Sequence, residues 1–317
     1  MGDLNGTSLV DLSMIVASDQ MLGALLVLLV CITGSIFNMK AFLRLKTQQI
    51  NAPHFAGYAR AHVLFDTFNL VSFLLHMPWS LLFPEYWALV DNATNIPFGY
   101  FALATEFCAF LSSMFLTINR AASLLAINKG SKVSFSPLWI IVPSFVFLYL
   151  VSIAFLFPGC NFTFDRVEMQ WYFSKTPCGN FISFYIDFMF ICSFFTVEVL
   201  IDFCVLIVFS IRTRKWTKQG AIAGNNTVRE LRMFAQSSLA SLGFVYMLVS
   251  FQFFTGMTDS RFWKFVHTTL AWEVSHCVQG ITIITLDSTS KSTRGRKTTI
   301  GEAGKSILIT TTTGRIR

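Results

Sequence analysis

Residues 21–39 read MLGALLVLLVCITGSIFNM and contain no charged side chain. A helix needs about 20 consecutive apolar residues to cross the hydrocarbon core of a bilayer, so this stretch predicts a membrane span. Three further uncharged stretches follow at residues 67–84, 133–164 and 233–258. Of the 317 residues, 54% are hydrophobic and 13% are charged, which is about half the charged share of a soluble domain. The sequence therefore argues against a water-soluble globular protein.

Three more apolar stretches have the length of a span but carry acidic residues. They are residues 97–119 with Glu106, residues 181–211 with Asp187, Glu198 and Asp202, and residues 262–286 with Glu273. An acid is tolerated in a span when it faces the interior of a helix bundle. We therefore predict an all-α integral membrane bundle of seven transmembrane helices over residues 21–287. An N-terminal tail at 1–20 and a basic, Ser/Thr-rich tail at 288–317 flank it.

The basic residues are distributed unevenly among the predicted loops. Twenty of the 24 Lys and Arg residues fall in the first, third and fifth loops and in the C-terminal tail. Cytoplasmic loops attract positive charge, so we expect a plasma-membrane protein with its N-terminus outside and its C-terminus in the cytoplasm. Three Asn-x-Ser/Thr sequences, at Asn5, Asn92 and Asn161, fall in segments that this topology makes extracellular. We predict glycosylation at these three sites.

Two of the seven cysteines, Cys160 and Cys178, lie in the same predicted extracellular loop. Disulfides form in oxidising extracellular compartments, so we predict a Cys160–Cys178 disulfide that closes this loop. The other five cysteines lie inside predicted spans, where a cysteine behaves as a small apolar residue.

Several residues, in a fixed order along the chain, give the sequence a family resemblance. They are Gly34 with Asn38, the pair Asn119-Arg120, the loop GCNFTFDRVEMQWYFSKTPCGNFISFYIDF at residues 159–188, Asp202, Gln236 and the Trp272-x-x-x-His276 spacing. Over nearly all of residues 30–286 the chain resembles the nematode serpentine receptors of class X (Srx). These are seven-helix, chemoreceptor-like proteins related to rhodopsin-like G-protein-coupled receptors.

The resemblance implies a receptor and not an enzyme. It implies an unknown small-molecule or peptide ligand outside and a heterotrimeric G protein inside, and the Ser/Thr-rich tail is compatible with arrestin capture. We expect coupling to depend on Arg120 above all, because a basic residue at the end of an apolar helix is not explained by lipid attraction. The expected coupling surface also includes Asn119, Arg212, Arg214 and Lys215. A cationic surface of this kind equally suits anionic lipid.

The chain also departs from the rhodopsin-like pattern. An acid usually precedes the arginine at the end of helix 3, whereas Asn119 stands there in this sequence. We therefore expect a weaker restraint on Arg120. The cysteine usual at the top of helix 3 and the Asn-Pro-x-x-Tyr motif of helix 7 are also missing, and Leu286-Asp287-Ser288 is the nearest candidate for the latter.

Polar residues within the spans are the candidates for switching and ligand binding. Asn38, Asp66 and Asp287 form a predicted polar switch cluster; the alternative is that Asp66 is solvated at the membrane interface. Ligand contacts are predicted for Glu106, Asp187, Glu273 and His276. For Glu106 the alternative is a neutral acid that bonds to a neighbouring helix, and for His276 it is a satisfied buried histidine. Glu273 and His276 are three positions apart on one helix, so they could also share a proton.

Two other functions stay open at the level of sequence. A seven-helix zinc hydrolase would use residues such as His62, Asp66 and His276, but no His-x-x-x-His spacing occurs. A ligand-gated channel or transporter would use the acids of residues 181–211, but the sequence shows no internal duplication of the kind common in transporters. We expect no cofactor, no bound metal and no nucleic-acid partner.

Overall fold

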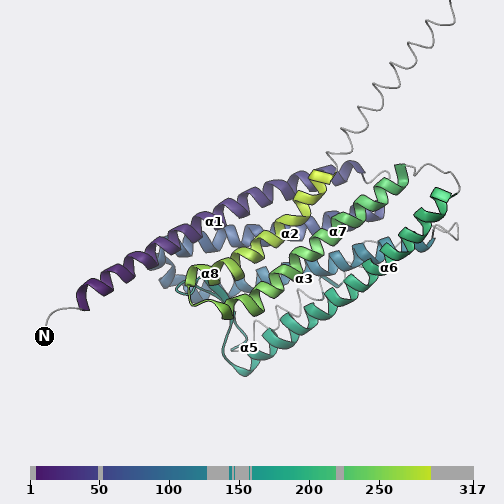
Figure 1. Ribbon diagram of the computed structural model, residues 1–317. Coiled ribbons are helices and arrows are strands. Elements are labelled where there is room, and N and C mark those ends of the chain that lie inside the picture. Colours follow the sequence, from purple (N-terminus) through teal and green to yellow (C-terminus); the bar gives the residue numbers. More distant parts are fainter. Residues whose placement is uncertain are drawn as a thin grey trace, which may run out of the picture.

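Long helices account for most of the described structure. The computed structural model describes residues 5–48, 53–126, 159–218 and 225–286, together with positions 143, 144, 146 and 157. The long helices are α1 (Asn5–Gln48), α2 (Pro53–Leu82), α3 (Pro84–Ala126), α6 (Ile191–Lys218), α7 (Asn225–Val249) and a last helix that starts as α8 (Arg261–Phe265) and runs to residue 286. They pack as one elongated bundle (Figure 1).

Four described segments are long and apolar enough to cross a membrane. They are Ser18–Thr47, Thr94–Ala122, Pro177–Ile211 and Phe234–Met257. α1 and α6 expose large apolar side chains such as Leu29 and Phe203, as lipid-facing helices do. The span in α3 is mostly buried, so α3 runs through the middle of the bundle. The prediction of an all-α membrane bundle is confirmed, while the predicted span at residues 133–164 lies largely outside the described residues.

The last residues of that predicted span form a strand and not a helix. β1 (Phe162–Asp165) pairs with β2 (Gln170–Phe173) as an antiparallel hairpin in which Phe164 lies opposite Trp171. The prediction was wrong here because an uncharged run does not distinguish a helix from a strand. The physical cause is the alternation of buried Phe162 and Phe164, which has the two-residue period of a strand.

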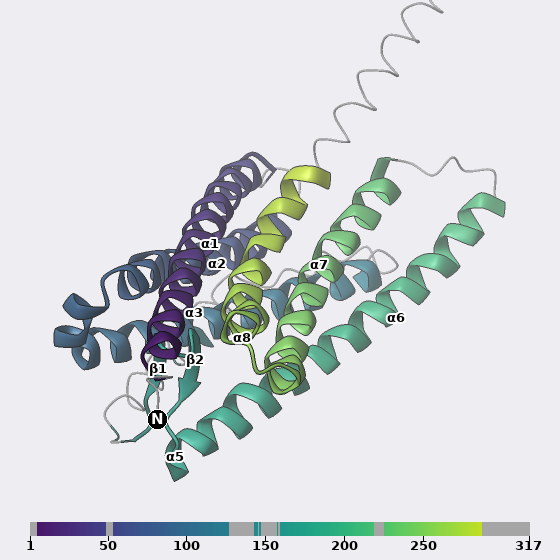
Figure 2. The same ribbon diagram turned by 60° about the vertical axis from the view of Figure 1, so that its left-hand side comes forward.

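The two ends of the bundle carry different features. The end with the β1–β2 hairpin is the hairpin end. The other is the Arg120 end: Arg120 lies on α3 about 38 Å along the helix axis from Asn95, which contacts the hairpin. The start of α1 and the end of the last helix lie at opposite ends of the bundle (Figures 1 and 2). A chain that starts at one end of the bundle and finishes at the other passes along the bundle an odd number of times. The segment predicted as a tail is helical from Asn5, ahead of the candidate span that starts at Ser18.

Three helices contain π-helical turns near the hairpin. These turns are η1 (Ile182–Phe190), η2 (Ser250–Phe254) and η4 (Val266–Leu270). The short helix α5 (Pro177–Phe181) precedes η1, and the 3-10 turn η3 (Thr255–Met257) follows η2. π-helical turns are rare and occur frequently at functional sites. Their location therefore favours the hairpin end as the place to look for one.

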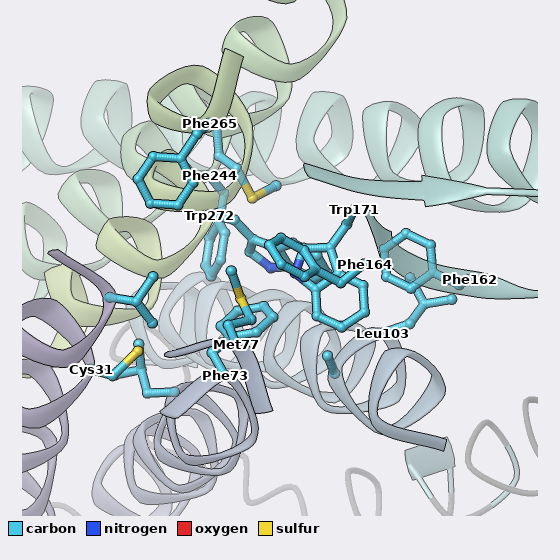
Figure 3. Packing of buried hydrophobic residues seen from close by; sticks show 14 of the residues in the cluster. Cys31, Phe73, Met77, Leu103, Phe162, Phe164, Trp171, Phe244, Phe265 and Trp272 are labelled. Atoms are coloured by element: carbon cyan, nitrogen blue, oxygen red, sulfur yellow. The ribbon is translucent and has the colours of Figure 1, made fainter. Parts of the chain in front are cut away.

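Aromatic residues of the hairpin fill the centre of the main core cluster. Phe162, Phe164 and Trp171 come from the strands, and Phe73 and Trp272 come from α2 and the last helix (Figure 3). Each buried aromatic side chain removes about 150–250 Å² from water, so this cluster is a major source of stability. The hairpin is thus part of the core and not a loose external loop.

Candidate functional site

The hairpin is fastened to the helices by hydrogen bonds to its backbone. Asn95 in α3 donates its side-chain amide to the carbonyl oxygen of Phe164 (2.9 Å) and accepts a bond from the Phe164 backbone N–H (2.8 Å). The Thr269 hydroxyl in η4 donates to the carbonyl oxygen of Met169 (3.2 Å). Gly99 allows β1 to approach α3, because a Cβ atom at this position would collide with the carbonyl oxygen of Phe162.

A disulfide joins the start of the hairpin to the start of α5. The Cys160–Cys178 bond predicted from the sequence is present and is therefore confirmed. The Tyr100 hydroxyl donates to the carbonyl oxygen of Cys160, and the Thr176 hydroxyl donates to that of Gly159. These contacts hold both ends of the segment between Cys160 and Cys178 on the bundle.

Trp171 is the central side chain of the hairpin. Its ring lies 5.8 Å from that of Phe73 and 6.3 Å from that of Trp272, measured between centroids. It also stacks on Phe162 at 5.2 Å. The side chain is 2% exposed, and its indole N–H has no hydrogen-bond partner among the described residues. The hairpin therefore reaches the helices beneath it mainly through aromatic packing.

Two of the predicted ligand residues, Glu106 in α3 and Asp187 in η1, lie close enough for their carboxyl groups to interact. Glu106 is 3% exposed, and its carboxyl group interacts electrostatically with that of Asp187. The rings of Phe107 and Phe190, whose centroids are 6.0 Å apart, pack α3 against η1 next to this pair. The structure thus brings together two acids that are 81 positions apart in the sequence.

The third predicted ligand residue, His276, bonds to the predicted switch cluster instead. Its Nδ1 atom lies 2.8 Å from Asp66 Oδ1, and its Nε2 atom lies 3.0 Å from the indole nitrogen of Trp272. Asn38 donates its side-chain amide to the backbone carbonyl oxygen of His276 at 3.0 Å. Asn38 and Asp66 are therefore joined through His276, and both are fully buried. The alternative in which Asp66 is solvated at the interface is contradicted, and Asp287 lies outside the described residues.

Glu273, the fourth predicted ligand residue, is fully buried next to α1. Its carboxyl group lies beside the thiol of Cys31, and neither carboxyl oxygen makes a hydrogen bond of good geometry with a described residue. Its sequence neighbour His276 bonds to Asp66 and not to it. His276 is thus the satisfied buried histidine of the structural alternative, and its ring nitrogens are not shared with Glu273.

At the opposite end, Arg120 is restrained by an acid from a different helix. Its Nη1 atom lies 3.3 Å from Asp202 Oδ1 in α6, and the arginine side chain is 3% exposed. The Ser238 hydroxyl in α7 donates to the other oxygen of Asp202 at 3.3 Å. The prediction that Arg120 would be weakly restrained is wrong, because Asp202 supplies the acid that Asn119 lacks.

Glu198 lies one helical turn before Asp202 and joins the same three helices. Its Oε1 atom accepts hydrogen bonds from Ser113 (2.6 Å) and Thr117 (3.2 Å) in α3 and from Ser241 (2.8 Å) in α7. Both acids of α6 thus face the interior, as the helical spacing predicts. We call Ser113, Thr117, Arg120, Glu198, Asp202, Ser238 and Ser241 the polar seam.

These features can be compared with known proteins. The sequence profile of a family described as serpentine type 7TM GPCR chemoreceptor Srx matches residues 28–287. The chain belongs to the Srx family. The family is a receptor family, so this Srx chain is a multi-pass membrane protein of the receptor type. No curated protein matches the chain.

The remaining predicted sites of the Srx chain are only partly described. Asn119 is buried, Arg214 is exposed and Asn161 is half-buried. The side chains of Arg212, Lys215, Asn5 and Asn92 lie outside the described residues. Within the described ranges, no group of three or more His, Cys, Asp and Glu side chains is arranged to hold a metal ion.

Three polar contacts were not predicted from the sequence. Asn95 was given no role, although an asparagine in an apolar span is a signal that something polar must be bound there. His62 was not assigned to the Asp66 cluster, although the two residues are four positions apart on α2. The Ser and Thr partners of Glu198 had no distinguishing signal, because such residues are common in membrane helices.

Proposed function

We propose that this Srx receptor lies in the plasma membrane, binds a small ligand at its hairpin end and activates a heterotrimeric G protein at its Arg120 end. The hairpin end would face the outside, as the distribution of Lys and Arg predicts. The observation that carries the proposal is Arg120, a buried arginine at the end of the central helix whose ion pair spans α3 and α6. The membership of the chain in a chemoreceptor family supports the same reading.

The Arg120 end has the features expected of a coupling surface. Arg120 and Asp202 are both largely buried, so separating them requires each charge to find a new partner. Asp202 also accepts a bond from Ser238, so a shift of α7 would weaken the hold of Asp202 on Arg120. A G-protein segment that presents carbonyl or carboxylate oxygens would then offer Arg120 a replacement. Arg214 and the basic residues near it would add attraction to an acidic partner.

At the hairpin end, Glu106 and Asp187 favour a ligand with a positive charge. The two acids lie near each other, and neither forms an ion pair with a described Lys or Arg side chain. The uncharged stretch at residues 133–164 contains no Lys or Arg that would neutralise them. A protonated amine between the two carboxylates would supply the missing charge. His276 bonds to Asp66, and Glu273 lies beside Cys31, so these two residues would act on the ligand only indirectly.

The test is a screen of primary and quaternary amines on cells that express the receptor with reporters for several Gα classes. We expect a response that falls at least tenfold in potency in Glu106→Gln and Asp187→Asn, because each variant removes one carboxylate. Arg120→Ala should abolish the response when variant and unsubstituted receptor are compared at equal surface amounts. Lys46→Ala is the matched control, since Lys46 is an exposed basic residue of α1.

Two results would contradict the proposal. An undiminished response in Arg120→Ala would remove the coupling role of Arg120. A ligand-evoked current that persists in cells without the matching Gα subunit would instead indicate a channel.

A further inference from the structure

Asp66 lies between two histidines in the middle of the bundle. One oxygen, Oδ1, lies 2.8 Å from Nδ1 of His276 in the last helix. The other, Oδ2, lies 3.4 Å from Nε2 of His62, four positions earlier on α2. All three side chains are fully buried. One carboxyl group thus has a partner on a different helix and a second partner on its own helix.

Trp272 fixes the direction of the hydrogen bond between His276 and Asp66. The indole N–H of Trp272 can only donate, so His276 Nε2, at 3.0 Å, must carry a lone pair. The proton of the neutral ring is then on Nδ1, which donates to Asp66 Oδ1. Trp272 therefore holds His276 in the tautomer that bonds across the helices to Asp66.

The second contact of Asp66 is incomplete. Although Asp66 Oδ2 and His62 Nε2 are 3.4 Å apart, neither atom makes a hydrogen bond of good geometry. The two residues are adjacent on one face of α2, so rotation of their side chains alone would complete this bond. The bond with His276 differs, because it also depends on the position of the last helix relative to α2.

The surroundings of the three residues connect both ends of the receptor. Above them, Trp272 packs against Trp171 of the hairpin and against Phe73 of α2 (Figure 3). Below them, Phe244 of α7 stacks on His62 with ring centroids 6.0 Å apart and meets the edge of His276 at 5.5 Å. A change in the partner of Asp66 would therefore move both rings on which Phe244 rests. Phe244 and the seam residues Ser238 and Ser241 lie within about two turns of α7.

We propose that Asp66 is a two-position switch that exchanges its hydrogen bond with His276 for one with His62 when Trp272 leaves His276. While Trp272 donates to His276, Asp66 joins α2 to the last helix. When a shift of the hairpin withdraws Trp272, His276 loses its fixed tautomer, and Asp66 turns to His62 on its own helix. The tie between α2 and the last helix is then broken, and Phe244 transmits the change to α7. The link to signalling rests on the function proposed above, whereas the exchange itself does not.

The exchange can be measured directly by ¹⁵N NMR of the histidine rings. The full-length receptor is labelled with ¹⁵N-histidine and reconstituted in phosphatidylcholine nanodiscs, and the signals are assigned with His276→Asn and His62→Phe. In the unsubstituted receptor we expect His276 to carry its proton on Nδ1, with Nε2 unprotonated. Trp272→Phe keeps an aromatic ring but removes the N–H, and it should convert at least half of His276 to another protonation pattern and give His62 a hydrogen-bonded Nε2–H. The exposed Trp263 provides the control, because Trp263→Phe should leave both rings unchanged.

Two NMR results would overturn the switch. One is a proton on Nε2 of His276 in the unsubstituted receptor. The other is a spectrum of Trp272→Phe that matches the unsubstituted one at both histidines. If Trp272→Phe does not fold, His62→Phe takes its place: the phenyl ring preserves the stacking on Phe244 but removes the second partner of Asp66. In this variant Asp66 has no second partner, so the switch requires the His276–Asp66 bond to be permanent. His276 should then show a single protonation pattern, and exchange between two patterns would contradict the switch.

A signalling assay separates this inference from the proposed function. Basal G-protein activity should rise at least threefold in Trp272→Phe. It should return to the original level when His62→Phe is added, because Asp66 then has no second hydrogen-bond partner. If NMR shows the exchange and basal activity does not change, the proposed G-protein function fails and the switch stands. If basal activity changes without any exchange at the histidines, the switch is wrong and the proposed function stands.

Discussion

The hairpin end and the Arg120 end of the receptor are held together by different forces. At the hairpin end, Trp171 and its neighbours are joined by aromatic packing, and the polar bonds that fasten the strands go to their backbone. At the Arg120 end, the polar seam joins α3, α6 and α7 through side-chain carboxylates, hydroxyls and one guanidinium group. Packing responds to the shape of what is inserted, whereas an ion pair responds to replacement of a partner. The hairpin end is thus suited to sense a ligand and the Arg120 end to exchange one bonding partner for another.

The largest effect should come from removing the central aromatic of the hairpin. Trp171→Ala deletes a side chain that is 2% exposed, and truncation of this kind costs about 3–5 kcal/mol. Thermal unfolding of the purified receptor in detergent should show the loss. Tyr172→Ala, on the next residue but 40% exposed, is the control and should change the unfolding temperature little. Equal effects of the two variants would mean that the hairpin does not contribute to the core.

The next largest effect should come from breaking the ion pair at the opposite end. Asp202→Ala leaves Arg120 buried without its carboxylate, and loss of one partner from a buried pair costs about 3 kcal/mol. The same unfolding assay measures this loss. The double variant with Arg120→Met should regain a large part of it, because no charge then remains unpaired. Additive losses in the double variant would show that the two side chains do not interact.

A smaller effect is expected within the polar seam. Ser113→Ala removes one of three hydroxyl donors from Glu198, which should cost about 1.5 kcal/mol. Ser193→Ala, in the same α6 helix as Glu198, is the matched control, since Ser193 is exposed and bonds only to a carbonyl of its own helix. A comparison of their unfolding temperatures decides whether Glu198 is a structural junction. No difference between the variants would argue that it is not.

The smallest effect is expected at Glu273. Its carboxyl oxygens make no hydrogen bond of good geometry with described residues, and an ionised carboxylate is costly in such a place. Glu273→Gln preserves the shape of the side chain and removes the acid, so stability should change by less than about 1 kcal/mol. Glu198→Gln is the contrast: the Glu198 carboxylate accepts three hydrogen bonds, so its replacement should lower the stability of the receptor more than Glu273→Gln does. A larger loss at Glu273 would point to an ionic role for this acid.

The sequence predicted the helical membrane bundle, and it predicted which acids face inward on α6. These features follow from the length of uncharged runs and from helical periodicity, which are local properties of the chain. The Cys160–Cys178 disulfide was also predictable, because both residues lie in one short loop.

The partners of the polar residues were not predictable in the same way. Asp202 with Arg120, and Asp66 with His276, meet only after the helices have taken their places in the bundle, and their sequence separations are 82 and 210 residues. Helical spacing identifies the inward face of each helix but not the helix that it meets. The strand at Phe162 was missed for a different reason, since hydrophobicity alone suits a strand and a helix equally.

Agonist-independent signalling by Asp202→Asn tests the central claim most directly. This substitution keeps the shape of the side chain that holds Arg120 and removes its charge, and it can be measured with a panel of Gα reporters at matched surface expression. We expect basal activity several times that of the unsubstituted receptor, and loss of this activity when Arg120→Ala is added. Basal activity equal to that of the unsubstituted receptor, with Asp202→Asn folded and present at the surface, would contradict the role of this ion pair.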